Sequence, residues 1–478
     1  MKRILFALSL AGVLCGGSTT WAETDHAASA VLTTSHHAVL DTDHNTSHPS
    51  DPALNTDTAD NNTATAVDES SNTATTALDH GDTAWVLSST ALVLLMTIPG
   101  LALFYGGMVR KKNVLSTMVH SLVAAAVVSV IWVVIGYSLA FSEGNAWIGG
   151  LDKVMLGDLH PDTLSGSIPE ILFVIFQMTF AIITVAIISG SIAERMKFGA
   201  FVAFISIWVI AVYAPIAHWV WGGGWLMHDG ALDFAGGTVV HINSGVAGLV
   251  AAYMLGKRMG FGKESMAPHN LTLTVLGASL IWVGWFGFNG GSALAANGSA
   301  AYALVTTQIA AAAATITWLL VEKVVRTKAS VLGGASGAVA GLVVITPAAG
   351  FVTVTGALWM GLIGGIVCFW GTTRLKQLLK VDDSLDAFGL HAVGGIAGAI
   401  LTGFFASHFI MGDDAPVGLS GIMHQVYVQV IGVVATIVYS AVLTAIILKV
   451  IDLLIGLRVE SEDERMGLDL SQHGERIE

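Results

Sequence analysis

The sequence predicts an all-α polytopic membrane protein with eleven transmembrane helices, arranged as two inverted five-helix repeats followed by a final helix. Three observations support this fold class. The 478-residue chain is 54% hydrophobic and 12% charged, with a mean hydropathy of +0.72, values typical of polytopic membrane proteins. Its basic residues gather in alternate connecting segments. Two glycine-rich segments, each with one histidine, recur in the two halves of the chain.

The first 22 residues are typical of a cleaved signal peptide. Lys2 and Arg3 precede an apolar run from Ile4 to Val13, and Thr20-Trp-Ala22 is a suitable small-residue cleavage site. The apolar run is shorter than the ~20 residues that a transmembrane helix requires. An uncleaved extra helix is therefore the less favoured alternative.

Residues 23–82 are expected to form a disordered periplasmic tail. The segment is rich in Thr, Ala, Asp, Asn and Ser, and it holds eleven Asp and Glu but no Lys or Arg. So little apolar surface does not offset the entropy of ordering the chain. A solvated spacer is favoured over transition-metal binding, which would use the imidazoles of His26, His36, His37, His44, His48 and His80.

The membrane domain is expected to cover residues 83–456. Its eleven apolar segments are 84–107, 116–142, 170–193, 199–217, 234–256, 271–290, 300–321, 331–348, 353–372, 386–406 and 426–450. With this count, 18 of the 19 Lys and Arg downstream of the tail fall on one side, and only Lys153 falls on the other. The positive-inside rule then places the mature N-terminus outside and the C-terminus in the cytoplasm.

Two histidines inside these apolar segments are the strongest functional candidates. His241 is followed by Gly245 and Gly248, and His391 is followed by glycines at the same two spacings. On a helix these glycines share the face of the histidine and allow a neighbouring backbone to approach closely. Ionisable residues within a membrane are usually functional, so we favour a polar path lined by two hydrogen-bonded imidazoles over separate bonds to nearby carbonyl groups.

Aromatic residues and one carboxylate precede the fifth segment. Trp219, Trp221 and Trp225 lie in the sequence AHWVWGGGW, and an indole face there can attract a small cation. Tryptophans are also common at membrane interfaces, so composition alone leaves both interpretations open. Asp233 begins the fifth segment, where capping of the helix is the larger expected role and negative potential at the outer mouth the smaller one.

The third and sixth segments carry further candidates. Phe180 ends FQMTF in the third segment, and Phe288 and Ser292 lie in WVGWFGFNGGS at the end of the sixth. A serine hydroxyl can accept a hydrogen bond from an N–H donor, and phenylalanines can close a pore to water. Without context, the two phenylalanines are more often lipid-facing or core residues.

Several ordered motifs together resemble the ammonium transporter (Amt) family of bacteria. They are ALFYGGMVRKKN, DFAGGTVVHINSGVAGL, GWFGFNGGSA, VDDSLDAFGLHAVGG and the closing GLRVESEDERMGLDLSQHGE. The resemblance covers about Ala84 to Glu475 and implies a homotrimer in the bacterial inner membrane with one pore in each subunit. It implies uptake of ammonium or ammonia through the lipid bilayer.

The resemblance also implies residue roles. Trp221, Phe180 and Ser292 look like an outer ammonium-recognition site that Asp233 supports. Phe180 with Phe288 looks like a stacked hydrophobic gate, and His241 with His391 looks like the twin histidines of the pore. Our hypothesis for the mechanism is capture of ammonium outside, deprotonation near the gate, passage of ammonia past the histidines and a separate route for the proton along the imidazoles.

Residues 457–478 match the regulatory tail of that family, which implies contact with a PII-type signal protein. Composition alone favours a solvated terminus.

A neutral gas channel of the same fold and an ammonium sensor remain the alternative functions. The histidines lack a paired nucleophile or a set of metal ligands, so no enzyme activity is expected. We also expect no metal, cofactor or nucleic-acid partner, and the two cysteines, Cys15 and Cys368, offer no disulfide framework.

Overall fold

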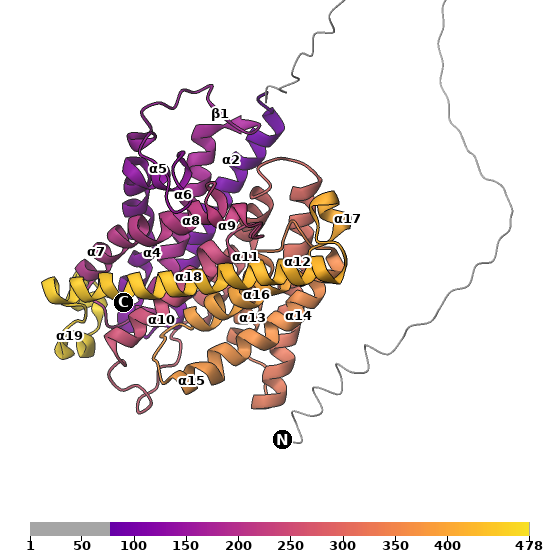
Figure 1. Cartoon of the computed structure of the whole chain (residues 1–478). Helices are drawn as coiled ribbons and strands as arrows, with labels where there is room; N and C mark the ends of the chain where they lie inside the picture. Colours follow the sequence, from indigo (N-terminus) through magenta and orange to yellow (C-terminus); the bar gives the residue numbers. More distant parts are fainter. Residues whose placement is uncertain (1–76, 478) are drawn as a thin grey trace, which may run out of the picture. The chain divides into compact units, whose positions relative to one another are not determined.

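The structure is a computed structural model that describes residues 77–477. The predicted signal peptide and the predicted tail up to residue 76 lie outside the described residues. The described part is a bundle of long helices, in which the longest, α18 (Gly418–Ile455), lies across α16 (Val393–Phe405) and α10 (Asn243–Leu255) (Figure 1). The predicted helical membrane fold is confirmed.

The bundle begins at α2, whose start is fixed by a capping side chain. The Asp79 carboxylate accepts a hydrogen bond of 2.8 Å from the backbone N–H of Asp82, so the helix begins at His80. The last three residues of the predicted tail (23–82) therefore belong to the first helix. Asp is a preferred N-cap residue because its carboxylate satisfies an N–H group that has no partner within the helix.

The helices of the first half are interrupted by π-helical turns and short 3₁₀ turns. They are α2 (His80–Leu95), η1 (Met96–Leu101), α3 (Ala102–Met108), η2 (Lys111–Asn113), α4 (Val114–Ile131), η3 (Trp132–Gly136), α5 (Tyr137–Phe141), η4 (Val154–Leu156), α6 (Glu170–Ile192), α7 (Phe198–Trp208), η5 (Val209–Tyr213), α8 (Ala214–Trp221), α9 (Trp225–His228), η6 (Gly237–Ile242) and α10 (Asn243–Leu255). Before α6, the strands β1 (Leu164–Ser165) and β2 (Ile168–Pro169) pair antiparallel.

The second half and the tail complete the bundle. Their elements are α11 (Leu271–Trp285), η7 (Phe286–Gly290), α12 (Gly298–Arg326), α13 (Val331–Ile345), α14 (Val354–Trp370), η8 (Gly371–Leu375), α15 (Lys376–Leu379), η9 (Phe388–Ala392), α16 (Val393–Phe405), α17 (His408–Met411), η10 (Gly412–Asp414), α18 (Gly418–Ile455), α19 (Ser461–Met466) and α20 (Leu468–His473).

Within the described residues, ten helical stretches are long and apolar enough to cross a membrane. They correspond to all the expected segments except the eighth, which is the shorter apolar helix α13. The second half of this helix, residues 337–345, is fully buried among its neighbours, whereas Val331 at its start is exposed. The exact count of eleven spans therefore stays a prediction.

The two histidine-bearing helices cross closely, as the glycine spacing predicted. A Cβ atom added at Gly245 would lie 2.3 Å from the backbone nitrogen of Ala392, the residue after His391. A Cβ atom added at Gly395 would lie 3.1 Å from the Cβ atom of His241. Each helix thus packs its glycine against the π-helical turn that carries the histidine of the other helix. This reciprocal packing fits the predicted internal repeat.

The C-terminal tail folds back onto the bundle. Asp469 accepts a hydrogen bond of 2.8 Å from the backbone N–H of Ser116, and the backbone N–H of Leu468 donates one of 2.8 Å to Asn113 Oδ1. Glu464, which is 1% exposed, accepts from the Met259 backbone N–H and from Arg458. The tail is therefore a packed part of the domain, although its composition alone favours a solvated segment.

Candidate functional site: a ring-lined path

At one end of the bundle lies a pocket of about 200 Å³, which we name the outer pocket because the predicted topology places this end outside. Its walls are mostly aromatic and aliphatic, with a few polar groups; the lining residues are Phe173, Gln177, Phe180, Val220, Trp221, Met227, Phe234, Ser292 and Leu294. The pocket brings together three residues that the sequence singled out, because α6, the end of α8 and the turn after η7 meet there. Asp233, the fourth candidate for this site, does not line it.

Asp233 supports the pocket from behind, through hydrogen bonds to its carboxylate and to its backbone carbonyl. Its carboxylate accepts hydrogen bonds of 2.6 to 3.2 Å from four successive backbone N–H groups, those of Gly236, Gly237, Thr238 and Val239. The expected capping of the fifth span is therefore present. The backbone carbonyl of Asp233 also accepts a 2.8 Å hydrogen bond from Trp221 Nε1, which fixes the indole ring at the pocket wall.

The hydrogen bonding of Ser292 determines what its hydroxyl offers the pocket. The hydroxyl donates its proton to the carbonyl oxygen of Phe288 at 2.8 Å. A hydroxyl has one proton to donate, so the Oγ lone pairs that remain can only accept. Ser292 is thus suited to a ligand that donates hydrogen bonds.

Beyond the pocket, two phenylalanine rings close the path. Phe180 and Phe288 are stacked, with ring centroids 4.3 Å apart and planes 25° apart, and both are almost fully buried. The outer face of this pair meets Trp221, whose ring centroid lies 5.8 Å from that of Phe180 at 86°. The stacked rings separate the outer pocket from the interior of the bundle.

The two histidines meet behind this pair of rings. His241 Nδ1 and His391 Nδ1 are 3.2 Å apart, and both side chains are buried. Because a hydrogen bond needs one donor and one acceptor, two neutral rings in complementary tautomers satisfy this contact. The His241 ring also stacks on Trp285 with centroids 5.3 Å apart, and Trp285 Nε1 donates to Thr346 Oγ1 at 2.9 Å.

Past the histidines, the space is narrow and almost entirely apolar. A cavity of about 10 Å³ lies beside His391, and its other lining residues are Met96, Leu101, Phe104, Ile183, Ile187, Ile281, Trp285 and Val339. This volume is near the minimum for one water molecule, and the walls provide few polar partners. A neutral molecule therefore fits this stretch better than a hydrated ion does.

Sequence reasoning missed two residues of the path. Gln177 lines the outer pocket, is 8% exposed, and its Oε1 atom has no hydrogen-bond partner among the described residues. Trp285 stacks on His241. Each lies three residues before a recognised phenylalanine, on the same helical face, and this spacing was the signal available in the sequence.

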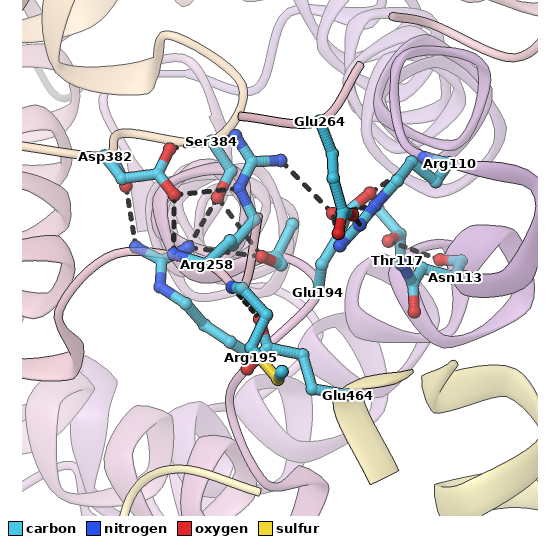
Figure 2. Close-up of polar contacts among 12 residues, drawn as sticks. Arg110, Asn113, Thr117, Glu194, Arg195, Arg258, Glu264, Asp382, Ser384 and Glu464 are labelled. Atoms are coloured by element: carbon cyan, nitrogen blue, oxygen red, sulfur yellow. Dashed lines mark hydrogen bonds and ion pairs between the residues drawn. The ribbon is translucent and has the colours of Figure 1, made fainter. Parts of the chain in front are cut away.

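The opposite end of the bundle holds a group of charges, all buried except the half-buried Arg110. We name it the inner ionic cluster: Arg110, Glu194, Arg195, Arg258 and Asp382 (Figure 2). Arg258 donates to both carboxylate oxygens of Asp382 at 2.9 Å and lies 3.3 Å from Glu194. Burial raises the pKa of the Asp382 carboxyl, but the hydrogen bonds and charge of Arg258 outweigh it. The pKa of Asp382 therefore lies below its ordinary value.

The fold and the path together define a polytopic helical membrane protein with a narrow, ring-lined passage for a small molecule. The family model described as "Ammonium Transporter Family" matches residues 84–477. The chain belongs to this family.

Individual relatives agree with this assignment. An ammonium transporter from Bacillus subtilis is 53% identical over 401 residues, which cover 84% of this chain and 98% of the relative. The crystal structure of Saccharomyces cerevisiae Mep2 superposes with a TM-score of 0.74 at 37% identity, covering 80% of this chain and 88% of that one. A structure titled "Sensor Amt Protein" superposes with a TM-score of 0.76 at 32% identity, covering 82% and 98%.

Proposed function

We propose that the protein takes up ammonium by binding it in the outer pocket, removing a proton, and conducting ammonia past the histidine pair. The observation that carries this proposal is the unbroken series of rings from Trp221 through Phe180 and Phe288 to His241 and His391. The series runs from a pocket that suits a cation into a space that suits a neutral molecule.

Recognition of ammonium rests on two kinds of contact. The indole face of Trp221 and the ring of Phe180 attract a cation, by about 0.5 to 2 kcal/mol depending on desolvation. Ser292 Oγ and Gln177 Oε1 supply hydrogen-bond acceptors. Potassium has a similar charge and size but donates no hydrogen bonds, so its lost hydration is not compensated in the same way.

Deprotonation follows from the apolar surroundings of the passage. An ion without a counter-charge is costly in such a space, whereas ammonia is neutral. The proton takes a separate route along the imidazoles, where Nδ1 of one ring contacts Nδ1 of the other. The resulting transport is uptake of ammonia coupled to movement of a proton.

We further propose that the protein lies in the bacterial inner membrane with a fixed orientation. The outer pocket faces the periplasm, and the basic end with the inner ionic cluster faces the cytoplasm, in agreement with the positive-inside rule. Residues 1–22 act as the signal peptide, 23–82 include the periplasmic tail, 83–456 form the membrane domain and 457–478 form the cytoplasmic regulatory tail.

A homotrimer and a PII-type signal protein at the cytoplasmic face complete the proposal, on the basis of family resemblance. Cross-linking of the protein in native membranes tests the trimer. Pull-down with a PII-type protein tests the partner.

The decisive experiment records current across a solid-supported membrane that carries the reconstituted protein. Pulses of ammonium are compared with pulses of potassium for wild type, Trp221→Leu and the double variant His241→Ala/His391→Ala. We expect a saturable current with ammonium and none with potassium. Trp221→Leu should raise the half-saturating ammonium concentration, and the double variant should alter the current.

A matched control is His120→Ala. His120 is also a buried histidine of a membrane helix, but it packs on Phe201 and does not line the path. Its variant should conduct as wild type does. Rapid internal alkalinisation without current would instead identify a neutral ammonia channel.

An ammonium sensor is the second candidate function, and the structural likeness to "Sensor Amt Protein" favours testing it. Absence of both current and alkalinisation, together with binding of ammonium to the purified protein, would support the sensor. Wild-type flux in the double histidine variant would contradict the proposed route.

A further inference from the structure

We propose that a cavity at the inner end of the path binds a phosphate-bearing anion. The cavity measures about 480 Å³ and lies where the end of α12, the start of α13 and the segment from η8 to α15 meet. Ser336 lines it, one helical turn before Val339, which lines the narrow space beside His391. The cavity is therefore the inner mouth of the path, and we name it the inner mouth.

The charges around the inner mouth favour an anion. Lys257, Arg326, Lys376 and Lys380 line it together with the carboxylates of Glu322 and Asp386, which leaves a formal excess of positive charge. Glu322 lies 3.2 Å from Arg326, and Asp386 forms an ion pair with Lys376. The ion pairs among the described residues include neither Lys257 nor Lys380. An ammonium ion is repelled by this excess, whereas an anion is attracted.

The donors of the inner mouth suit phosphate in particular. The guanidinium group of Arg326 is held over the ring of Phe369, 5.6 Å from its centroid, and Lys257 lies 5.5 Å from the ring centroid of Phe261. A guanidinium fork matches the spacing of phosphate oxygens, and ammonium groups add point charges beside it. Two uncompensated lysines also match the double negative charge of a phosphate group.

The size and walls of the cavity allow more than inorganic phosphate. About 480 Å³ falls within the range of small-molecule sites, and Trp318, Phe261 and Phe369 give the wall an apolar part. The phosphate group can therefore belong to a soluble metabolite or to a lipid headgroup. In either case the bound molecule covers the passage at Ser336 and should lower the ammonium current. The effect on current rests on the proposed function, whereas the binding of the anion does not depend on it.

The test is calorimetric titration of inorganic pyrophosphate into the purified full-length protein in nanodiscs of neutral phosphatidylcholine. Wild type is compared with Lys257→Gln/Lys380→Gln, which removes both uncompensated charges and leaves the two ion pairs intact. We expect saturable binding to wild type that weakens with added salt, and affinity at least about tenfold lower in the double variant.

The matched control is Lys323→Gln, an exposed lysine of α12 that does not line the cavity. It should bind pyrophosphate as wild type does, and all variants should keep the wild-type melting temperature. Absence of binding to wild type, or equal affinity in wild type and the double variant, would overturn the proposal.

A second series identifies the source of the phosphate group. The titration is repeated in nanodiscs with increasing phosphatidylglycerol. Competition by the lipid in wild type, but not in the double variant, indicates a headgroup as the occupant. Unchanged affinity for pyrophosphate indicates a soluble phosphate compound.

Discussion

At the residue scale, the hydrogen bond from the Ser292 hydroxyl to the Phe288 carbonyl decides which role that hydroxyl takes in the outer pocket. The bond uses the hydroxyl proton, so Ser292 can only accept from a ligand. Gln177 Oε1 adds a second acceptor, because it is buried without a partner among the described residues. Both groups suit an ion that donates hydrogen bonds, whereas potassium has no hydrogen bond to donate to them.

This arrangement predicts the effect of removing the Gln177 amide. Gln177→Leu should raise the half-saturating ammonium concentration by at least about tenfold, since a hydrogen bond to a charged group is worth roughly 1.5–3 kcal/mol. The maximal ammonium current should change much less, because the gate and the histidines are untouched. Current against ammonium concentration measures both quantities.

Gln308→Leu is the control for this prediction. Gln308 is also an amide on a membrane helix, but it accepts a hydrogen bond from Trp282 outside the path. Equal half-saturating concentrations in Gln177→Leu and wild type would show that Gln177 takes no part in recognition.

At the scale of elements, the paired glycines set the distance between the two histidine helices. Gly245 packs against the backbone beside His391, and Gly395 packs against His241. A side chain at either glycine would push the helices apart, because most of the atoms it meets are backbone atoms or Cβ atoms, which cannot turn away as the end of a flexible side chain can. The contact of 3.2 Å between the imidazoles depends on this close approach.

Gly245→Ala should therefore separate the histidines and lower stability. The added methyl would lie 2.3 Å from the Ala392 nitrogen, so we expect a loss of about 1–3 kcal/mol in the free energy of unfolding and a reduced ammonium current. Chemical unfolding in micelles and current recordings measure the two effects.

The control substitution is Gly199→Ala in α7, where an added Cβ meets nothing within 4 Å. It should be neutral or slightly stabilising, because alanine favours helix. A fully stable, fully active Gly245→Ala protein would contradict the proposed role of the crossing.

The tail is a second element whose position rests on a few buried polar contacts. Asp469→Ala leaves the backbone N–H of Ser116 without its partner, so α20 should detach more often from α4. We expect faster hydrogen exchange and earlier proteolysis in residues 457–477. Glu462→Ala changes an exposed acid in the same tail and should leave both unchanged. Equal protection in both variants would show that this contact does not hold the tail.

At the scale of the whole molecule, the inner ionic cluster joins segments that are far apart in the chain (Figure 2). Arg258 follows α10, Glu194 follows α6, and Asp382 precedes η9. Because the pKa of Asp382 is lowered in the fold, its stabilising contribution is fully present above the ordinary pKa of an aspartate. It is lost as the pH falls through the lowered value.

Removal of the central cation should destabilise the domain strongly. Arg258→Met leaves the buried carboxylates of Asp382 and Glu194 without this partner, for which we expect a cost of about 3–5 kcal/mol in chemical unfolding. Adding Asp382→Asn should recover part of the loss, because it removes one uncompensated charge.

The exposed pair of Lys449 and Asp452 provides the comparison. Lys449→Met should cost less than about 1 kcal/mol, since both side chains are well exposed and screened by solvent. Similar costs for Arg258→Met and Lys449→Met would contradict the structural importance of the cluster.

Much of the path could be predicted from sequence because its signals are local. His241 and His391 stand out as ionisable residues in apolar segments, and their glycines lie at helical spacing. Phe180, Phe288, Trp221 and Ser292 required the family resemblance, because isolated aromatic residues in membrane helices are usually core or lipid-facing. Gln177 and Trp285 were missed for the same reason.

By itself, the sequence determined the helical membrane class, the approximate spans and the two histidine segments, because hydropathy, charge distribution and glycine spacing are properties of neighbouring residues. Only the tertiary structure decided that Asp233 does not line the outer pocket, that the tail packs on the bundle, and that Arg258 pairs with Asp382. The residues that form these contacts are separated by long stretches of chain, or have several possible partners close by. Their pairing depends on which surfaces the packed helices bring together, and no local pattern encodes it.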